Sequence, residues 1–286
     1  AVARALKGAD YERTLVSTTA DGIRIEPLYT GADTEAGADD GGFPGFDPLL
    51  RGSSVSPRPD GAWDIRTRIA HPDPGTANAQ ALADLGNGAT SVEFTGVTAT
   101  TVPALLAGIV LDAAPVSLRA GAEGIDAARA FLALAEPGDG PTGCLGLDPI
   151  DGGPEAAACA VLAAEVAARN PGVRTFIASG ATVADAGASE GQEIGYLLGA
   201  ATQYLRAATG AGLTPEQAAR QICLEVTADV DIFTTIAKTR ALRFAWAAVL
   251  ASSGVAVDDN ADGIVSIVAT SSYRSLTQVD PWVNLL

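Results

Sequence analysis

The segment Val173–Ser179, with the sequence VRTFIAS, and the stretch that follows it decide the fold. The run is short, apolar and rich in β-branched residues, which is typical of a buried strand. Between 192 and 209, apolar side chains recur at the spacing of one helix face, at Ile194, Leu197, Leu198, Ala201 and Leu205. A second buried run, ICLEV, follows at 222–226. A strand, a helix and a strand in this order predict two parallel strands joined by a right-handed crossover.

The same alternation continues on both sides of this unit. We predict strands at 91–95, 115–118, 144–147, 173–179, 222–226 and 264–270, and helices at 101–107, 125–135, 154–169, 192–209 and 231–252. A capping-box pattern at Thr214 to Gln217, with Pro at the first helical position, starts another helix. This alternation requires a parallel sheet, either open and doubly wound or closed as a barrel. We predict an α/β fold, a TIM-type (β/α)8 barrel that is incomplete in this chain, with about six to seven βα units.

The first 90 residues differ from the rest. Residues 31–61 are rich in Gly, Asp, Pro and Ser, with Phe43, Phe46, Leu49 and Leu50 as the few apolar side chains. This pattern favours an extended arm that lies over another surface, although a partly disordered linker has a similar composition. We therefore expect an extended N-terminal arm over 1–90 and a partial barrel over 91–286.

Composition excludes several classes of protein. The chain has 286 residues, and its 34 acidic against 18 basic residues give a net charge of −16, which disfavours nucleic acid or anionic membrane as partners. Three Cys and one His argue against a disulfide framework or a Cys-rich zinc site, and indicate a reducing cytoplasm. The apolar runs are too short to span a bilayer, so we expect a soluble protein. The absence of Met indicates a processed or excerpted chain.

Catalytic side chains are scarce where a barrel would place them, just after each strand. These positions are Gly96, Arg119, Asp148, Gly180 to Thr182, Thr227 to Asp229 and Ser271 to Tyr273. The single His, His71, falls in the predicted arm, where a surface role is favoured. Asp148, Glu225 and Asp229 are candidate magnesium ligands, but a turn and a helix start explain two of them better. Cys223 has no His to activate it and is interpreted as an inert buried thiol.

Several motifs point to one family. They are Arg51-Gly52 followed by Trp63-Asp64-Ile65-Arg66, the segment from Ser179 to Ala188 (SGATVADAGA), and the segment from Ile236 to Arg243 (IAKTRALR). Upstream, PLYT at 27–30 and GFPGFDP at 42–48 match the arm of the same family. With these motifs in this order over nearly the whole chain, the sequence resembles methylmalonyl-CoA mutase.

The resemblance implies a fold and a cofactor. Catalytic chains of that family have a barrel threaded by the acyl-CoA, followed by a separate cobalamin-binding domain, and use adenosylcobalamin for a radical carbon-skeleton rearrangement. The cobalamin-binding domain, with its axial His, is absent from this chain as given. We expect adenosylcobalamin in the family's holoenzyme and no cofactor bound by this chain alone.

The resemblance also implies that the acyl-CoA site is dismantled. In catalytic members, polar side chains form the acyl-CoA site at a set of positions, and here only Ser117 keeps the expected residue type. The other positions are here Ser54, Ser56, Gly61, Arg68, Arg119, Thr182, Gln221, Cys223 and Thr270. The chain therefore resembles the non-catalytic small subunit of a heterodimeric mutase of propionate metabolism, paired with a catalytic large subunit that interconverts (R)-methylmalonyl-CoA and succinyl-CoA. One alternative is an active isomerase for another acyl-CoA that uses Arg68, Arg119 and Thr182. Another is a metal-dependent lyase on a barrel.

Overall fold

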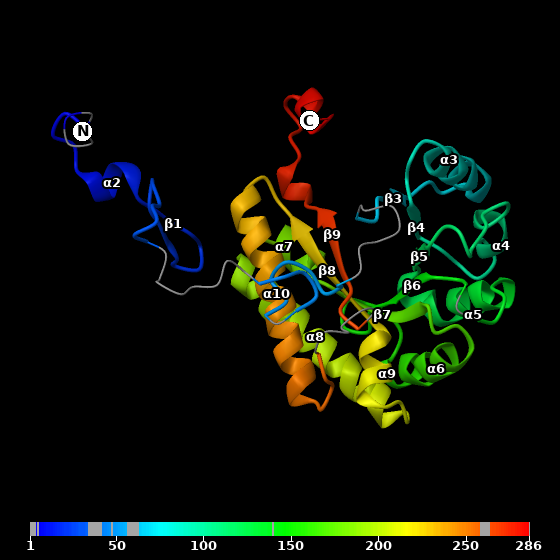
Figure 1. The fold of residues 1–286 in the computed structure, drawn as a ribbon. Coiled ribbons are helices and arrows are strands. Elements are labelled where there is room, and N and C mark those ends of the chain that lie inside the picture. Colours follow the sequence, from blue (N-terminus) through cyan, green and yellow to red (C-terminus); the bar gives the residue numbers. More distant parts are fainter. Residues whose placement is uncertain are drawn as a thin grey trace.

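A single curled sheet of parallel strands organises the chain. The computed structural model describes residues 4, 6–33, 42–46, 48–55, 63–138, 140–257 and 264–285. The strands follow the chain order, β3-β4-β5-β6-β7-β8-β9, and every neighbouring pair is parallel. Their bounds are β3 Arg66–Ile69, β4 Ser91–Thr95, β5 Val116–Arg119, β6 Gly143–Leu147, β7 Val173–Ser179, β8 Ile222–Ala228 and β9 Ile267–Ser271. Figure 1 shows the sheet curling into a half-barrel, which confirms the incomplete barrel predicted from the sequence.

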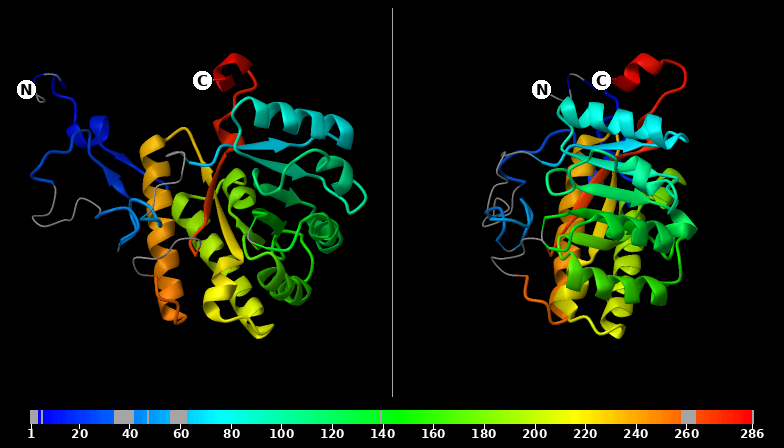
Figure 2. Two further views of the ribbon diagram at one scale, coloured as in Figure 1. Left: turned by 45° about the vertical axis from the view of Figure 1, so that its right-hand side comes forward. Right: turned by 90° about the vertical axis from the view of Figure 1, so that its right-hand side faces the viewer.

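Helices cover the convex outer side of the sheet (Figure 2). Their bounds are α3 Pro74–Gly86, α4 Val102–Leu105, α5 Gly124–Leu134, α6 Ala156–Arg169, α7 Ala181–Asp185, α8 Glu190–Gly210, α9 Pro215–Arg220 and α10 Ile232–Ser252, with a 3-10 turn η1 at Gly121–Glu123. The predicted capping box is present at the start of α9, where Thr214 and Gln217 satisfy each other's backbone N–H groups. The five helices expected from periodicity are all present, with ends that differ by a few residues.

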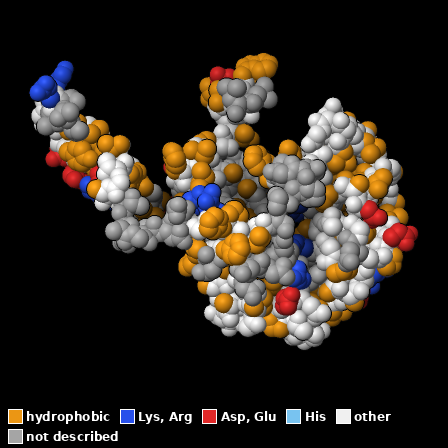
Figure 3. Space-filling model, in the orientation of Figure 1, with side chains coloured by type: hydrophobic (Ala, Val, Ile, Leu, Met, Phe, Trp, Pro, Cys, Tyr) orange, Lys and Arg blue, Asp and Glu red, His pale blue; other side chains and the backbone are white. Residues whose placement is uncertain are grey.

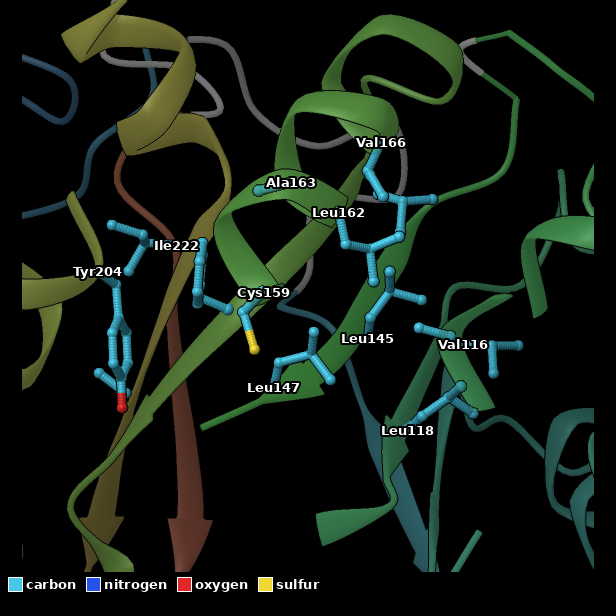
Figure 4. Close-up of a cluster of buried hydrophobic side chains, with 14 of the residues drawn as sticks. Val116, Leu118, Leu145, Leu147, Cys159, Leu162, Ala163, Val166, Tyr204 and Ile222 are labelled. Carbon is cyan, nitrogen blue, oxygen red and sulfur yellow. The ribbon is translucent and has the colours of Figure 1, made fainter. Parts of the chain in front are cut away.

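The hydrophobic core lies between the sheet and this helix layer. Every second residue of a strand points outward, so Leu145 and Leu147 of β6 pack beneath Leu162 and Val166 of α6 (Figure 4). Each of these four side chains is at most 1% exposed. Apolar burial of this kind, at about 25 cal/mol per Å² of apolar area, is the main force that holds the helices on the sheet.

The sheet begins at Arg66 and not at residue 91, so its first strand and helix were missed. β3 pairs in parallel with β4 over residues 66–69 and 91–94, and α3 connects the two strands. β3 has only four residues, RTRI, and two of them are Arg, so it lacks the apolar run that marks the other strands. The helix that follows has clear start signals in Asp73, which caps Thr76, and Pro74.

The arm extends away from the sheet, as Figure 1 shows for α2 Tyr11–Leu15 and the hairpin of β1 Ser17–Thr18 and β2 Arg24–Ile25. The tip of this hairpin touches the helix layer, because Asp21 accepts hydrogen bonds from Ser189 Oγ and from the Gly191 N–H at the start of α8. Further along, Leu49 is 1% exposed, whereas Phe43 is 75% exposed. The backbone near Leu49 is held by Arg243 of α10.

The two edges of the sheet are β3 and β9, which do not pair with each other within the described residues. After β9 the chain forms two 3-10 turns, η2 Tyr273–Ser275 and η3 Pro281–Leu285. Within the described part of the chain, no helix is both long and apolar enough to cross a membrane.

Candidate functional site

The concave inner face of the half-barrel carries charged side chains. Arg68 of β3, Glu93 of β4, Arg119 of β5 and Glu225 of β8 meet there and form a closed ring, which we call the charge square. Because β3 and β8 are not neighbours in the sheet, an ion pair between Arg68 and Glu225 must cross the interior. Basic side chains are visible in the central hollow in Figure 3.

Each carboxylate of the charge square forms an ion pair with both arginines. Arg68 Nε lies 2.6 Å from Glu93 Oε1, and Arg68 Nη2 lies 2.7 Å from Glu225 Oε1. Arg119 Nε lies 3.3 Å from Glu93 Oε2, and Arg119 Nη2 lies 2.7 Å from Glu225 Oε2. Ser179 Oγ of β7 donates a further hydrogen bond to Glu225. The ring therefore ties together five of the seven strands.

The ring also fixes the charges of its members. Glu225 is 1% exposed, so burial alone would favour its neutral form. For Glu225, burial is outweighed by Arg119, Ser179 and Arg68, which together lower its pKa. For Arg119, burial is likewise outweighed by Glu225 and Glu93, which raise its pKa. Counted at their ordinary charges, the two arginines and two glutamates of the ring balance.

This arrangement is poorly suited to acid–base catalysis. A general base near neutral pH needs a pKa close to that pH, and the lowered pKa of Glu225 is far from it. The arginine side chains remain protonated at any working pH. The four side chains lie on the inner face of the half-barrel and are paired with one another. The geometry therefore indicates a buried ion-pair network and not a free acid or base.

Comparison with known proteins identifies the chain's relatives. The family model for methylmalonyl-CoA mutase matches residues 18–104 and 154–286. The chain is 40% identical to the methylmalonyl-CoA mutase small subunit of Streptomyces virginiae, over 98% of this chain and 47% of that protein. The chain belongs to the methylmalonyl-CoA mutase family.

Within this mutase family, the chain is more similar to small subunits than to a large one. It is 30% identical to the small subunit of Propionibacterium freudenreichii subsp. shermanii, over 97% of this chain and 45% of that protein. It is 25% identical to the large subunit of Streptomyces virginiae, over 82% of this chain and 38% of that protein. The chain spans about half the length of the curated relatives it matches.

One solved structure overlaps the chain only weakly. It is a putative mandelate racemase/muconate lactonizing enzyme from Roseovarius nubinhibens ISM complexed with magnesium, with a TM-score of 0.36 and 14% sequence identity over 76% of this chain and 56% of that chain. An overlap of this size supports no argument about this protein.

The resemblance to the mutase family implied a set of positions that form the substrate site in catalytic members. Five of these positions lie on strands that line the interior. Arg68 and Arg119 belong to the charge square, and Cys223 is 2% exposed beside it on β8. Ser117 lies inward on β5 between the outward-facing Val116 and Leu118, and Thr270 lies on β9 opposite Thr227. The Ser117 hydroxyl is buried and has no hydrogen-bond partner among the described residues.

The remaining expected positions lie outside the interior. Thr182, in α7 at the carboxyl end of β7, donates from Oγ1 to Asp151 Oδ2 at 2.7 Å. Gln221 precedes β8, accepts from Thr175 Oγ1 at 2.7 Å and donates to the Val173 carbonyl oxygen at 3.3 Å. Both have structural partners and neither faces a ligand-sized space together with the charge square.

Ser54 lies at the opposite end of the strands from Thr182. It lines a cavity of about 840 Å³ at the amino ends of β3, β7 and β9, together with Arg66, Arg174 and Ser266. Ser56 and Gly61 fall outside the described residues. The eight described positions are therefore spread over both ends and the middle of the barrel.

The candidate magnesium ligands do not converge. Asp148 accepts hydrogen bonds from Tyr204 Oη and from the Ser179 N–H, while Glu225 belongs to the charge square. Asp229 lies 3.8 Å from Arg274 Nε. Among the described residues, no group of three or more potential metal ligands is close enough to share an ion.

Glu93 is the member of the charge square that sequence reasoning missed. It is an acid in the middle of the predicted strand SVEFT, between Val92 and Phe94, which are at most 1% exposed. A charge at the alternate position of a buried strand is the signal that could have found it, because such a charge needs a partner.

Proposed function

We propose that this chain is the arm and barrel portion of the non-catalytic small subunit of an adenosylcobalamin-dependent methylmalonyl-CoA mutase. The charge square carries the proposal, because it occupies the space through which the acyl-CoA would thread in a catalytic barrel. In this proposal, a catalytic large subunit interconverts (R)-methylmalonyl-CoA and succinyl-CoA, a step of propionate metabolism, and the present chain is its heterodimer partner.

The arm and the half-barrel would have different tasks. Because β3 belongs to the sheet and α3 connects it to β4, we place the boundary between the two parts just before Arg66. The arm exposes apolar side chains that its own chain leaves uncovered, among them Leu28 at 73% and Tyr29 at 57%. Apolar side chains that cluster on an extended segment favour contact with a partner protein, and we propose the large subunit as that partner.

The cofactor would belong to the holoenzyme. Adenosylcobalamin, when bound, supplies the radical that begins the rearrangement. The residues of this chain do not fit its cobalt, because the single His, His71, is exposed in a turn and its Nδ1 accepts the Asp73 N–H at 3.1 Å. No step in this chain is therefore assigned to the cofactor. The three free, buried cysteines support a reducing compartment, and we propose the cytoplasm.

The proposal is tested by separating the two subunits. The small subunit that contains this chain, the large subunit and their coexpressed complex are each assayed for isomerisation of methylmalonyl-CoA with adenosylcobalamin. We expect a stable heterodimer on size-exclusion chromatography, activity in the complex, and none in the small subunit alone. Isomerisation by the small subunit alone would overturn the proposal.

A second measurement addresses the alternative of an isomerase for another acyl-CoA. That alternative needs Arg68, Arg119 and Thr182 free to hold a substrate, whereas all three have carboxylate partners. Calorimetric titration of the chain with a panel of acyl-CoA thioesters should give no heat of binding up to millimolar concentrations. Saturable binding of any thioester would favour the alternative over the plugged barrel.

A further inference from the structure

The long helix α10 carries apolar residues on its outer side as well as on its inner side. The inner side packs on the half-barrel through Leu242, Trp246 and Leu250, which are fully buried. A surface helix of a globular protein normally turns a polar side to solvent, so an apolar outer side indicates contact with another surface. We call this outer side the α10 face. It consists of the exposed residues Phe233, Ala237, Arg240, Ala241, Phe244 and Ala248.

Two aromatic side chains dominate the α10 face. Phe233 is 82% exposed and Phe244 is 53% exposed, and they lie about three helical turns apart on the same side of the helix. The residues between them include the small Ala237 and Ala241, which let a neighbouring helix approach closely. Aromatic side chains bury a large area and are enriched in protein interfaces. The α10 face therefore offers two aromatic contacts with room for a partner between them.

The charge of the α10 face is opposite in sign to that of the chain. The chain has a net charge of −16, whereas Arg240 is the single charged residue of the face. Arg243 lies beside it, and burial together with the charge of Arg240 lowers the pKa of Arg243. Among the described residues, neither arginine forms an ion pair with an acid. A partner with a carboxylate opposite Arg240 would gain a charge pair there.

A second copy of this chain is a poor match for the α10 face. Arg240 lies near the middle of residues 233–248, so two copies paired antiparallel about a two-fold axis would bring their Arg240 side chains together. Each copy also has a net charge of −16, and like charges oppose association. The charge pattern thus favours a different protein that offers an acidic side chain at this position.

The α10 face continues into the surface of the arm. At the start of α10, Thr234 lines a cavity of about 230 Å³ together with Thr19 and Ala20 of the arm hairpin. Further along, Arg243 Nη1 donates to the Leu49 carbonyl oxygen at 3.3 Å. Figure 2 shows α10 on the side of the half-barrel from which the arm extends. A protein that binds the exposed apolar side chains of the arm would therefore also meet the α10 face.

The helix is held rigidly from within. Lys238 of its inner side is buried, and its Nζ donates to Glu193 Oε2 of α8 at 2.7 Å and to Thr227 Oγ1 of β8 at 3.0 Å. A helix that is already fixed loses little conformational freedom when a partner binds it. The α10 face is thus a preformed surface, in contrast to the extended arm.

We propose that the α10 face is part of the surface that contacts the catalytic large subunit, and that this partner covers Phe233 and Phe244 with apolar side chains and places a carboxylate opposite Arg240. The inference rests on the proposed heterodimer and names a surface through which it forms. The arm supplies the extended part of the contact and α10 supplies the rigid part.

The first test is the affinity between separately purified subunits, measured by calorimetric titration with the small subunit that contains this chain. Phe233→Asp should weaken binding about tenfold or more. An acid is favourable in the first turn of a helix, so this variant should still form α10. Arg240→Glu should weaken binding several-fold at low salt and less in about 0.5 M salt, because salt screens the repulsion. Arg240→Lys should bind like wild type.

Matched variants on other helices provide the controls. Val161 of α6 is 55% exposed, and Arg206 of α8 is exposed, and both lie outside the α10 face. Val161→Asp and Arg206→Glu should bind the large subunit with wild-type affinity. A loss of affinity as large as that of the α10 variants would show that the effect comes from added negative charge, which contradicts the proposal.

Hydroxyl-radical footprinting reports directly what covers the α10 face. Phe233 and Phe244 should be oxidised in the small subunit alone and protected in the complex. Protection already present in the small subunit alone would show that its own chain covers the face, and would overturn the proposal. So would a small subunit that dimerises by itself and becomes monomeric with Phe233→Asp, because the occupant would then be a second copy.

The failure of this inference can be told apart from the failure of the proposed function. If the wild-type subunits do not bind each other, the heterodimer and its contact surface are both contradicted. If they bind, and Phe233→Asp and Arg240→Glu bind equally well, the heterodimer stands and the α10 face is not part of its contact surface.

Discussion

The two faces of the curled sheet are built from alternate residues of the same strands, yet they differ in chemistry. On β8, Ile222, Leu224 and Val226 point outward into the helix layer, while Cys223 and Glu225 point inward. The outer face is held by apolar burial, which has no direction and depends on area. The inner face is held by ion pairs, which depend on geometry and fail when one partner is lost. The apolar core and the charged side chains thus lie on opposite faces of one strand.

The largest effect is expected on the outer face. Phe176 of β7 is fully buried and stacks on Tyr204 of α8, with ring centroids 5.1 Å apart and planes 15° apart. Phe176→Ala should lower the free energy of unfolding by about 3–5 kcal/mol, because it leaves a cavity and removes the stacking partner. Urea denaturation measures the loss. Phe176→Leu, which keeps most of the volume, should cost about 1.5 kcal/mol or less, and equal losses for the two variants would contradict a packing role.

On the inner face, loss of one carboxylate should cost somewhat less. Glu225→Gln keeps the shape but leaves Arg68 and Arg119 to share Glu93 alone. Breaking a buried ion pair from one side should cost about 3 kcal/mol here, because the remaining charges stay buried. Urea denaturation measures this change as well.

A matched surface pair provides the control for that variant. Glu216 and Arg220 of α9 lie 3.2 Å apart with half-exposed side chains. Glu216→Gln should cost about 0.5 kcal/mol or less, since solvent screens the pair. If the two Gln variants lost the same stability, the charge square would contribute no more than a solvent-exposed ion pair.

Lowering the pH should remove only that part of the Glu225→Gln effect on stability that depends on the charge of Glu225. The expected change in the free energy of unfolding is therefore smaller than for the substitution itself. The pKa of Glu225 is lower in the folded protein than in an unfolded chain. Its contribution to stability is thus complete above the unfolded value of about 4.3 and is lost as the pH falls through the lower folded value. The stability difference between wild type and Glu225→Gln should shrink in urea titrations below about pH 4.3. A difference that stays constant with pH would show that the charge of Glu225 does not stabilise the fold.

The same contrast explains what the sequence could predict. The strands at 91–95 and 173–179 were found to the residue, because their outward side chains form local apolar patterns. The charge square could not be found, because Arg68 and Glu225 are 157 residues apart and meet only through register and curvature. β3 was missed for the same reason, since its inward positions are the charged Arg66 and Arg68. Hydrophobic periodicity predicts which residues face the outer helix layer. It does not predict which charged side chains pair on the inner face.

The smallest effect on stability is expected at the contact between the arm and the helix layer. A variant at this contact tests whether the arm is held against that layer. Asp21 accepts from Ser189 Oγ and from the Gly191 N–H at 3.0 Å, so a carboxylate lies at the positive end of α8. These hydrogen bonds lower the pKa of Asp21. Asp21→Asn keeps the shape and removes the charge, which at an exposed helix end changes stability by about 0.5 kcal/mol.

Global stability is therefore a weak readout for Asp21, and limited proteolysis is a better one. Cleavage within residues 6–33 should be several-fold faster in Asp21→Asn than in wild type, because the arm is released from the start of α8. Asp33→Asn is the matched control, since among the described residues the Asp33 carboxylate accepts hydrogen bonds only from Thr30, within the arm. If both variants were cleaved at the same rate, the contact at Asp21 would not hold the arm against the helix layer.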